Sequence, residues 1–231
     1  MFFRTLFLWL AGVPVTLIAF MGILLSLPFD RSGKVVHHIV GFWARILLAL
    51  SGVTVEIEGV DRLPEGPVIL ASNHQGAYDI LVLQSCLPLQ FRWIAKKSLF
   101  SIPIVGWSMT LAGYISVDRG RASLAYRSIE RAAEKVKRER VSVVIFPEGT
   151  RGTTGSLLPF KRGAFLLALK SGVPVVPVSI KGTLDILKRG SILIRPATVK
   201  IVIGTPIESV GMKEGALSER VREAVEQGLS R

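Results

Sequence analysis

The chain has 231 residues, of which 49% are hydrophobic, and its 29 Lys and Arg outnumber its 17 Asp and Glu, giving a formal net charge of +12. This length suits one α/β domain with a full core and an appendage, and excludes two ordinary domains together with a membrane segment. An apolar, basic chain fits an anionic membrane surface. Nucleic acid is disfavoured as a partner, because the sequence has no zinc-ligand spacing, helix-turn-helix signal or RNA-binding aromatic pattern.

The sequence offers few metal ligands. Cys86 is the only cysteine, which excludes a disulfide and a cysteine metal site and fits a reducing compartment. The three histidines are His37, His38 and His74, and the first two lie in an apolar amino-terminal region. Such a set cannot build a usual zinc site, so we expect no metal and no cofactor.

The amino-terminal region begins with a long apolar stretch. Residues 2–27 contain one charged residue, Arg4, and as a helix would measure about 39 Å, enough to cross a bilayer core of about 30 Å. Pro14 should kink this helix, and the sequence of residues 28–33 predicts a turn. A secretory signal peptide is disfavoured because the apolar run is long and lacks a small-residue cleavage site.

A second apolar stretch follows the turn. Residues 35–50 would measure about 24 Å as a helix and include Arg45, which is typical of an interfacial helix rather than a spanning one. We therefore expect residues 1–52 to form a helical hairpin embedded in one leaflet, at the cytoplasmic face of the cell membrane. A single crossing by the first stretch is the alternative.

Residues 53–231 are expected to form one catalytic domain. Short β-rich runs alternate there with helical ones, which predicts an α/β fold with a mostly parallel sheet flanked by helices. The predicted strands cover residues 53–58, 67–72, 91–95, 114–117, 141–146, 173–180 and 198–203. The predicted helices cover residues 80–87, 122–138, 163–171 and 214–228. Residues 99–111 are apolar and contain Pro103 and Gly106, so we expect a tunnel wall or a membrane-facing loop there.

The first motif, Asn73-His74-x4-Asp79, directly follows a predicted buried strand. In one regular helix the His74 and Asp79 side chains would lie about 140° apart, so the segment must turn first, and Gly76 permits this. Asp79 can then accept from one imidazole nitrogen and leave the other free as a base. For this spacing alone, a structural histidine is the more common explanation. Asn73 is the only asparagine in the chain, which indicates a specific role beside His74.

The second motif is Phe146-Pro147-Glu148-Gly149-Thr150-Arg151, at the end of another predicted strand. It brings a carboxylate, a flexible glycine and a guanidinium together. Open α/β sheets place ligands at the carboxyl ends of their strands, and an arginine loop can hold a phosphate there. The two motifs indicate acyl transfer onto a phosphorylated alcohol. A plain Glu148–Arg151 ion pair is the alternative for the glutamate.

Four blocks in order resemble the glycerolipid acyltransferase family, most closely the bacterial 1-acylglycerol-3-phosphate acyltransferases. They are Asn73-His74-x4-Asp79, residues 113–120 (Gly-Tyr-Ile-Ser-Val-Asp-Arg-Gly), residues 146–151 and residues 173–178 (Val-Pro-Val-Val-Pro-Val). The resemblance covers roughly residues 53–206.

The resemblance implies a mechanism. His74 would remove the proton from the free sn-2 hydroxyl of 1-acylglycerol 3-phosphate, and Asp79 would orient His74. The alcohol would then attack the thioester of acyl-CoA or acyl-carrier protein directly, giving phosphatidic acid. No serine intermediate is needed, and the chain contains no Gly-x-Ser-x-Gly elbow. Backbone amides near Gly76 or Gly149 are candidates for stabilising the oxyanion.

The resemblance also implies residues that bind the acceptor. Arg119 and Arg151 are the first candidates for its phosphate and Lys97 is the next, with Lys161 and Arg162 able to assist. Glu148, Gly149 and Thr150 complete the substrate-binding loop, and the fourth block is expected to shape the apolar pocket.

Three other functions stay open. The acceptor can be another lysolipid or glycerol 3-phosphate, or the same dyad can activate water in a thioester or lipid hydrolase. A non-enzymatic basic membrane scaffold would leave the four ordered blocks unexplained.

Overall fold

The computed structural model describes residues 2–118 and 120–231, and seven of its strands form one sheet in the order β1-β7-β6-β2-β5-β3-β4. The strands are β1 Val53–Glu58, β2 Ile69–Ser72, β3 Phe91–Lys96, β4 Ile115–Val117, β5 Ser142–Ile145, β6 Val175–Lys181 and β7 Ala197–Ile203. Neighbouring strands are parallel except β6 and β7, which are antiparallel. The predicted α/β fold with a mostly parallel sheet is confirmed.

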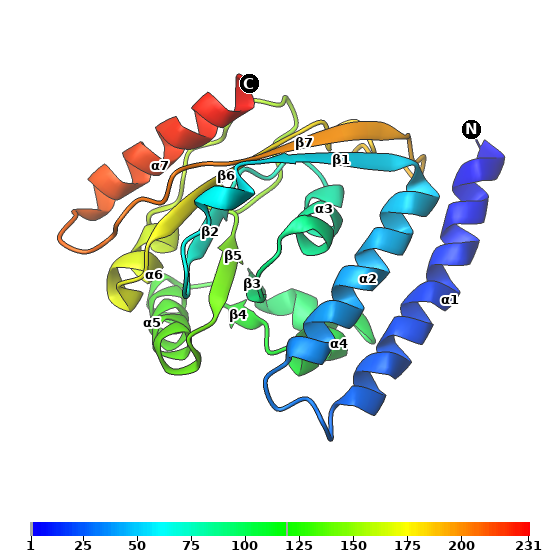
Figure 1. The fold of residues 1–231 in the computed structure, drawn as a ribbon, viewed down its shortest axis with the longest axis horizontal. Helices are drawn as coiled ribbons and strands as arrows, with labels where there is room; N and C mark the ends of the chain where they lie inside the picture. Colours follow the sequence, from blue (N-terminus) through cyan, green and yellow to red (C-terminus); the bar gives the residue numbers. More distant parts are fainter. Residues whose placement is uncertain (1, 119) are drawn as a thin grey trace.

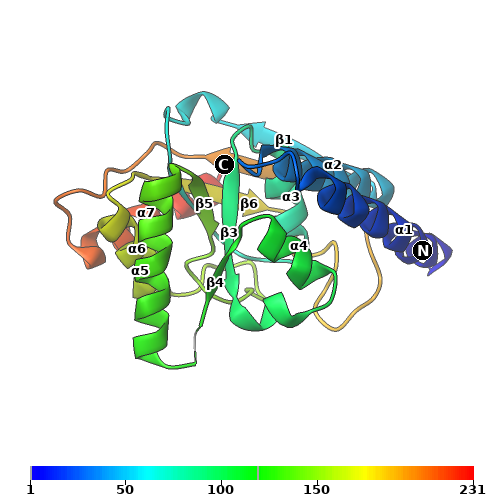
Figure 2. The same cartoon turned by 90° about the horizontal axis from the view of Figure 1, so that it is seen from below.

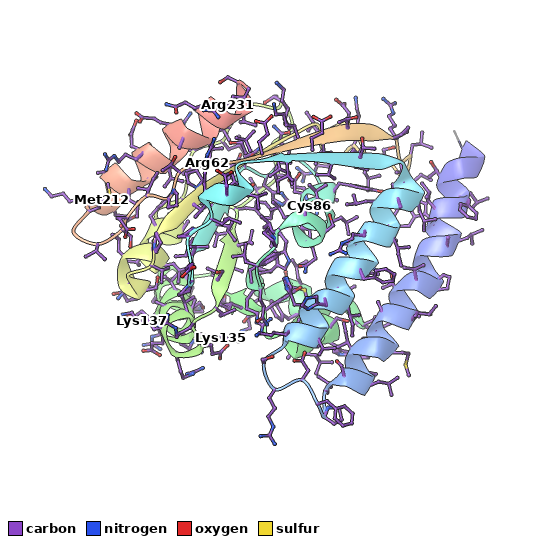
Figure 3. The ribbon with its side chains drawn as sticks, viewed as in Figure 1. Arg62, Cys86, Lys135, Lys137, Met212 and Arg231 are labelled. Carbon is purple, nitrogen blue, oxygen red and sulfur yellow. The ribbon has the colours of Figure 1, made fainter. Side chains whose placement is uncertain are left out.

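Helices cover both faces of this sheet (Figures 1 and 2). They are α1 Phe2–Ser26, α2 Lys34–Ser51, α3 Tyr78–Cys86, α4 Val105–Leu111, α5 Ala122–Glu139, α6 Arg162–Ser171 and α7 Glu214–Leu229, with short 3-10 helices η1 Val60–Arg62 and η2 Lys97–Ser101. Helices α5, α6 and α7 lie on one face, and α2 and α3 lie on the other. Figure 3 places Lys135 and Lys137 on α5, well separated from Cys86 at the end of α3.

The sheet separates two hydrophobic cores. Successive side chains of a strand point to opposite faces, so Leu70 joins the core beneath α2 and α3, whereas Ile69 and Ala71 join the core beneath α5, α6 and α7. Every residue of β2 and β5 is buried. These continuous apolar runs are typical of central parallel strands covered on both faces, and they give the residues that follow β2 and β5 a rigid base.

The amino-terminal region forms the predicted helical hairpin. The Trp43 indole N–H donates to Thr16 Oγ1 at 3.1 Å, joining α2 to α1, and α1 continues through Pro14. Both helices are long and apolar enough to cross a membrane, over Thr5–Ser26 and Lys34–Ser51, by length and composition. How the hairpin sits in a bilayer stays a prediction.

The prediction of a loop over residues 99–111 is wrong in part. This stretch contains the end of η2 and all of α4, and Trp107 of α4 contacts Phe20 of α1 with ring centroids 6.3 Å apart. A helix of seven residues is too short to show a clear periodicity, and it begins after Ile104 at φ 63, a conformation that β-branched residues rarely adopt. The expected exposure is present, since Leu99, Ile102, Val105 and Trp107 are all exposed.

Candidate active site

Three of the four blocks reach one edge of the sheet, and the fourth enters a strand of the same sheet from the other edge. The first block follows β2 and the third follows β5, and these strands are adjacent and parallel. Lys97 and Asp118 follow β3 and β4, the next two parallel strands. The fourth block enters β6, which pairs with β2 on its other side. The carboxyl ends of β4, β3, β5, β2 and β6 therefore meet at the edge where open α/β sheets bind ligands.

His74 and Asp79 form a hydrogen-bonded pair. The His74 Nδ1 and Asp79 Oδ2 atoms lie 2.7 Å apart, the Asp79 side chain is fully buried, and 12% of the His74 side chain is exposed. Oδ2 also accepts the backbone N–H groups of Gln75 at 2.7 Å and Gly76 at 2.9 Å. In a neutral imidazole whose Nδ1 faces a carboxylate, the proton lies on Nδ1, and Nε2 then has the lone pair that a general base needs.

A tight turn between β2 and α3 brings the pair together. Asp79 lies in the first turn of α3, as predicted. Gly76 is required for close packing, because a Cβ added to it would lie 2.7 Å from the Thr183 carbonyl oxygen. Asn73 holds the base of the turn, since its Nδ2 donates to the Ile180 carbonyl at 2.8 Å and its Oδ1 accepts the Ile180 N–H at 2.7 Å. The single asparagine thus ties β2 to β6.

Aromatic rings support the imidazole. The His74 ring stacks on Phe146 with centroids 3.9 Å apart and planes 10° apart, and Trp93 packs against Phe146 with centroids 5.6 Å apart. This stacking fixes the plane of the imidazole, and its only sequence signal is that Phe146 opens the third block. Sequence reasoning also missed Thr183, whose hydroxyl donates to Asp79 Oδ1.

Glu148 joins the third block to the first. Its Oε1 accepts the His74 N–H at 2.7 Å, its Oε2 accepts the Leu158 N–H at 2.9 Å, and the residue is only 3% exposed. Burial raises the pKa of Glu148, and the two amide hydrogen bonds oppose that shift. Within the described residues no ion pair joins Glu148 to Arg151. The carboxylate holds two loops together here, and its substrate-binding role stays a prediction.

Three candidate phosphate ligands, Arg151, Lys161 and Lys97, have described side chains. Arg151 is exposed and precedes Gly152, whose N–H donates to the His74 carbonyl at 2.8 Å. Lys161 lies over Gly149, where an added Cβ would be 2.9 Å from its Nζ. Lys97 is 70% exposed and pairs with Asp118 at 3.2 Å. Of these three cations, only Arg151 is directly next in sequence to a residue, Gly152, that bonds to His74.

Four further candidate residues belong to or flank the second and third blocks. Thr150 is exposed, and Gly149 has a φ of 70°, which favours glycine. Arg119 and the side chain of Arg162 lie outside the described part of the chain.

The two glycine amides considered for the oxyanion already have acceptors. The Gly76 N–H donates to Asp79 Oδ2, and the Gly149 N–H donates to the Phe146 carbonyl at 3.0 Å. This arrangement does not support either N–H group as the oxyanion donor.

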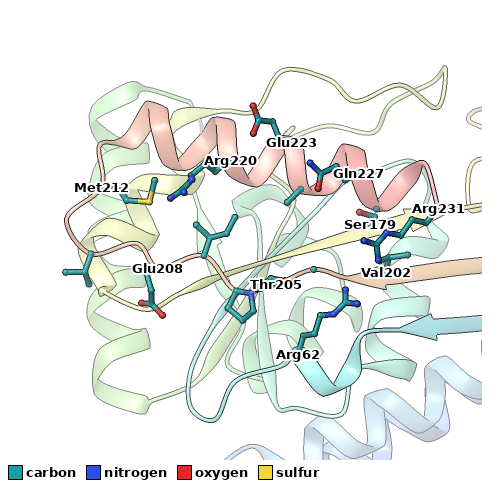
Figure 4. Close-up of a pocket in the computed structure, with 16 residues that line it drawn as sticks. Arg62, Ser179, Val202, Thr205, Glu208, Met212, Arg220, Glu223, Gln227 and Arg231 are labelled. Carbon is teal, nitrogen blue, oxygen red and sulfur yellow. The ribbon is translucent and has the colours of Figure 1, made fainter.

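A groove of about 690 Å³ lies between α7, the end of β7 and the loop that follows it (Figure 4). Charged side chains from Arg62, Glu208, Arg220, Glu223 and Arg231 line it. Gly204 in this groove bonds to Pro177 near the start of β6, whereas Thr183 follows the end of β6. The groove therefore lies toward the opposite edge of the sheet and contains neither member of the dyad.

Known proteins resemble this chain in sequence. An acyltransferase family model matches residues 54–181. The chloroplastic 1-acyl-sn-glycerol-3-phosphate acyltransferase BAT2 of Brassica napus is 36% identical over 88% of this chain and 59% of its own length. The chloroplastic 1-acyl-sn-glycerol-3-phosphate acyltransferase LPAT1 of Arabidopsis thaliana is 34% identical over 95% of this chain and 62% of its own length. The chain thus spans about three fifths of these two relatives.

A coconut relative and a solved structure match over larger shares of their own length. The 1-acyl-sn-glycerol-3-phosphate acyltransferase of Cocos nucifera is 32% identical over 92% of this chain and 69% of its own length. The crystal structure of the 1-acyl-sn-glycerophosphate acyltransferase PlsC from Thermotoga maritima superposes with a TM-score of 0.86 at 29% identity, covering 99% of this chain and 94% of that one. The family model covers more than half of the chain, and the first three blocks meet at one edge of the sheet. The chain therefore belongs to the acyltransferase family.

Proposed function

We propose that this protein transfers a fatty acyl group from acyl-CoA or acyl-carrier protein to the free sn-2 hydroxyl of 1-acylglycerol 3-phosphate, giving phosphatidic acid. The observation that carries this proposal is the 2.7 Å contact between His74 Nδ1 and the buried Asp79 carboxylate, which leaves Nε2 to act as a base. The names of the relatives supply the acceptor.

The proposed reaction needs no covalent enzyme intermediate. Nε2 of His74 takes the hydroxyl proton while the hydroxyl oxygen forms a bond to the thioester carbonyl carbon. The resulting imidazolium is stabilised by Asp79, which already bonds to Nδ1. The tetrahedral intermediate then collapses, the carbon–sulfur bond breaks, and the thiolate takes the proton from His74 to leave as a free thiol.

The acceptor phosphate is assigned to the cations near the third block. Arg151 is favoured because it is exposed and lies next to Gly152, which bonds to the His74 backbone. A guanidinium can hold a phosphate through two parallel hydrogen bonds. Arg119 and Lys97 are proposed as further ligands. Glu148, Gly149 and Thr150 shape the loop that presents Arg151.

We further propose that the protein works on the cytoplasmic face of the cell membrane. The hairpin and α4 expose large apolar side chains, including Leu10, Ile18 and Leu25 of α1 and Trp107 of α4. The net charge of +12 favours an anionic lipid surface around this apolar area. Both the acceptor and the acyl product carry long acyl chains, so attachment to the bilayer brings the site to its substrates.

Product identification by mass spectrometry tests the proposal. Purified protein is incubated with acyl-CoA or acyl-carrier protein and one of three acceptors: lysophosphatidic acid, another lysophospholipid, or glycerol 3-phosphate. We expect phosphatidic acid from lysophosphatidic acid as the main product. A faster reaction with an acceptor that lacks the phosphomonoester would contradict the phosphate assignments. Thiol release at full rate without any acceptor would identify a hydrolase.

A further inference from the structure

Thr183 lies immediately beyond β6 and contacts the dyad from outside its own segment. Its hydroxyl donates to Asp79 Oδ1, and the residue is fully buried. The other carboxylate oxygen, Oδ2, is bonded to His74 Nδ1 and to the N–H groups of Gln75 and Gly76. The turn from His74 to Asp79 thus supplies three partners for Oδ2, and Thr183 supplies one for Oδ1.

The backbone around Thr183 is held on several sides. Asn73 bonds to both backbone groups of Ile180, three residues earlier. Gly182 has a φ of 99°, and a Cβ added to it would lie 2.6 Å from the Thr198 carbonyl oxygen. The Thr183 carbonyl oxygen itself packs against Gly76. This close packing determines where the hydroxyl lies relative to the turn that carries the dyad.

We infer that Thr183 is a positioning residue for acyl transfer, whose hydroxyl fixes the orientation of the Asp79 carboxylate. The inference rests on the proposed role of His74 as the base. A carboxylate bonded through both oxygens cannot rotate about its Cβ–Cγ bond without breaking a hydrogen bond. Asp79 therefore keeps Oδ2 in line with His74 Nδ1 when the imidazole gains its second proton.

We expect Thr183 to affect the rate of the chemical step rather than substrate binding. Because Thr183 is fully buried, it has no surface with which to bind a substrate. Removal of its hydroxyl leaves Oδ1 of Asp79 without this donor in a site that excludes water, and such a buried acceptor is unfavourable. The carboxylate can then turn away from His74. We expect kcat to fall while KM for both substrates is retained.

A graded set of substitutions tests the role of the hydroxyl. Thr183→Val keeps the shape and removes the donor, and we expect kcat to fall about 10- to 100-fold, the effect of one hydrogen bond to a charged group. Thr183→Ser keeps the donor and should retain most of the activity, and Thr183→Cys, with a weak S–H donor, should fall between them. The inference would be overturned if kcat of Thr183→Val stayed within about two-fold of that of the unchanged protein. It would also be overturned if Thr183→Ser were as slow as Thr183→Val.

Ser179 of β6, four residues before Thr183, provides a matched control. It is also buried, and its hydroxyl donates to the Val225 carbonyl at 2.8 Å rather than to the dyad. We expect Ser179→Ala to lower the thermal midpoint comparably to Thr183→Val and to leave kcat unchanged. Equal losses of kcat in the two variants would show that Thr183 acts only through general stability.

The double variant with His74→Ala separates this inference from the proposed function. If Thr183 acts through the dyad, Thr183→Val should not lower the residual rate of His74→Ala any further. The same fold loss in both backgrounds would overturn the positioning role. Substantial activity in His74→Ala alone would instead contradict His74 as the base.

Discussion

His74 is fixed by contacts to its ring and to its backbone. Asp79 bonds to Nδ1 and Phe146 stacks on the ring, while Glu148 accepts the His74 N–H and Gly152 donates to the His74 carbonyl. Two segments far apart in the sequence, the first block and residues 146–152, therefore hold this histidine. A base held this rigidly loses little freedom when it reacts, which is the purpose of positioning in catalysis.

The buried Glu148 carboxylate predicts a measurable pH dependence of stability. Its pKa is raised by burial from the ordinary value of 4.5, so the folded protein holds this proton more tightly than the unfolded chain does. The unfolding free energy contributed by this group therefore increases as the pH falls through the raised pKa and levels off below about pH 4.5.

Thermal or urea unfolding of the unchanged protein and of Glu148→Gln checks this sign. We expect the unfolding free energy of the unchanged protein, relative to that of Glu148→Gln, to rise as the pH is lowered from about 7 toward about 4.5. A difference that shrinks over the same interval would show that the amide hydrogen bonds outweigh burial.

The sequence indicated which residues are candidates for the reaction, and it was less informative about the contacts that hold them. His74 and Asp79 were recognisable because both lie in one short motif with a known pattern. Asn73 bonds to Ile180 of β6, and Asp79 bonds to Thr183 just beyond β6, each more than 100 residues later. Such contacts depend on which strands become neighbours, and local patterns do not carry that information.

At the scale of elements, buried apolar runs and one strongly amphipathic helix made the fold predictable. The predicted strand over residues 53–58 matches β1, and the predicted helix over residues 122–138 differs from α5 by one residue. The order of strands in the sheet was not predicted, because pairing is decided by packing between elements. The short helix α4 was not predicted, because its seven residues show no periodic pattern.

The turn between β2 and α3 has little room for a residue larger than glycine at position 76. Gly76→Ala would place a Cβ 2.7 Å from the Thr183 carbonyl oxygen, so the turn or the β6 end must shift. We expect the acyl-transfer rate to fall at least about tenfold, since displacements near 1 Å at a catalytic group have effects of this size or larger. The rate of product formation at saturating substrate measures this loss.

Gly163→Ala serves as the control for that substitution. Gly163 lies in α6 with open space around the added Cβ, and alanine favours helix more than glycine does. Unchanged activity and an equal or higher thermal midpoint are expected. An unimpaired Gly76→Ala enzyme would show that the turn is more adaptable than its packing indicates.

The whole molecule has an apolar end and a polar end. Figure 1 shows α1 at one side of the sheet and α7 at the other. Large apolar side chains are exposed along α1 and α4, whereas α7 carries many charged residues. This asymmetry predicts one orientation on a bilayer, with the α1 and α4 side toward the lipid.

Matched substitutions at the two ends test this orientation. Ile18 of α1 and Val210 before α7 are both 71% exposed, so a glutamate at either position replaces an equally exposed apolar side chain. We expect Ile18→Glu to weaken binding to anionic phospholipid vesicles at least about tenfold, because a charge in the apolar layer is unfavourable. Val210→Glu should bind like the unchanged protein in the same sedimentation assay. Equal losses at both positions would indicate attraction governed by net charge alone.

The most direct test of the account is the rate at which His74→Ala forms phosphatidic acid from lysophosphatidic acid and an acyl thioester, measured by mass spectrometry alongside lysophosphatidic acid binding. We predict that the rate falls by at least about 10²- to 10⁴-fold, as expected when a general base is removed, while the dissociation constant of the lysolipid stays nearly unchanged. Phosphatidic acid formation by His74→Ala at a rate close to that of the unchanged protein would contradict the account.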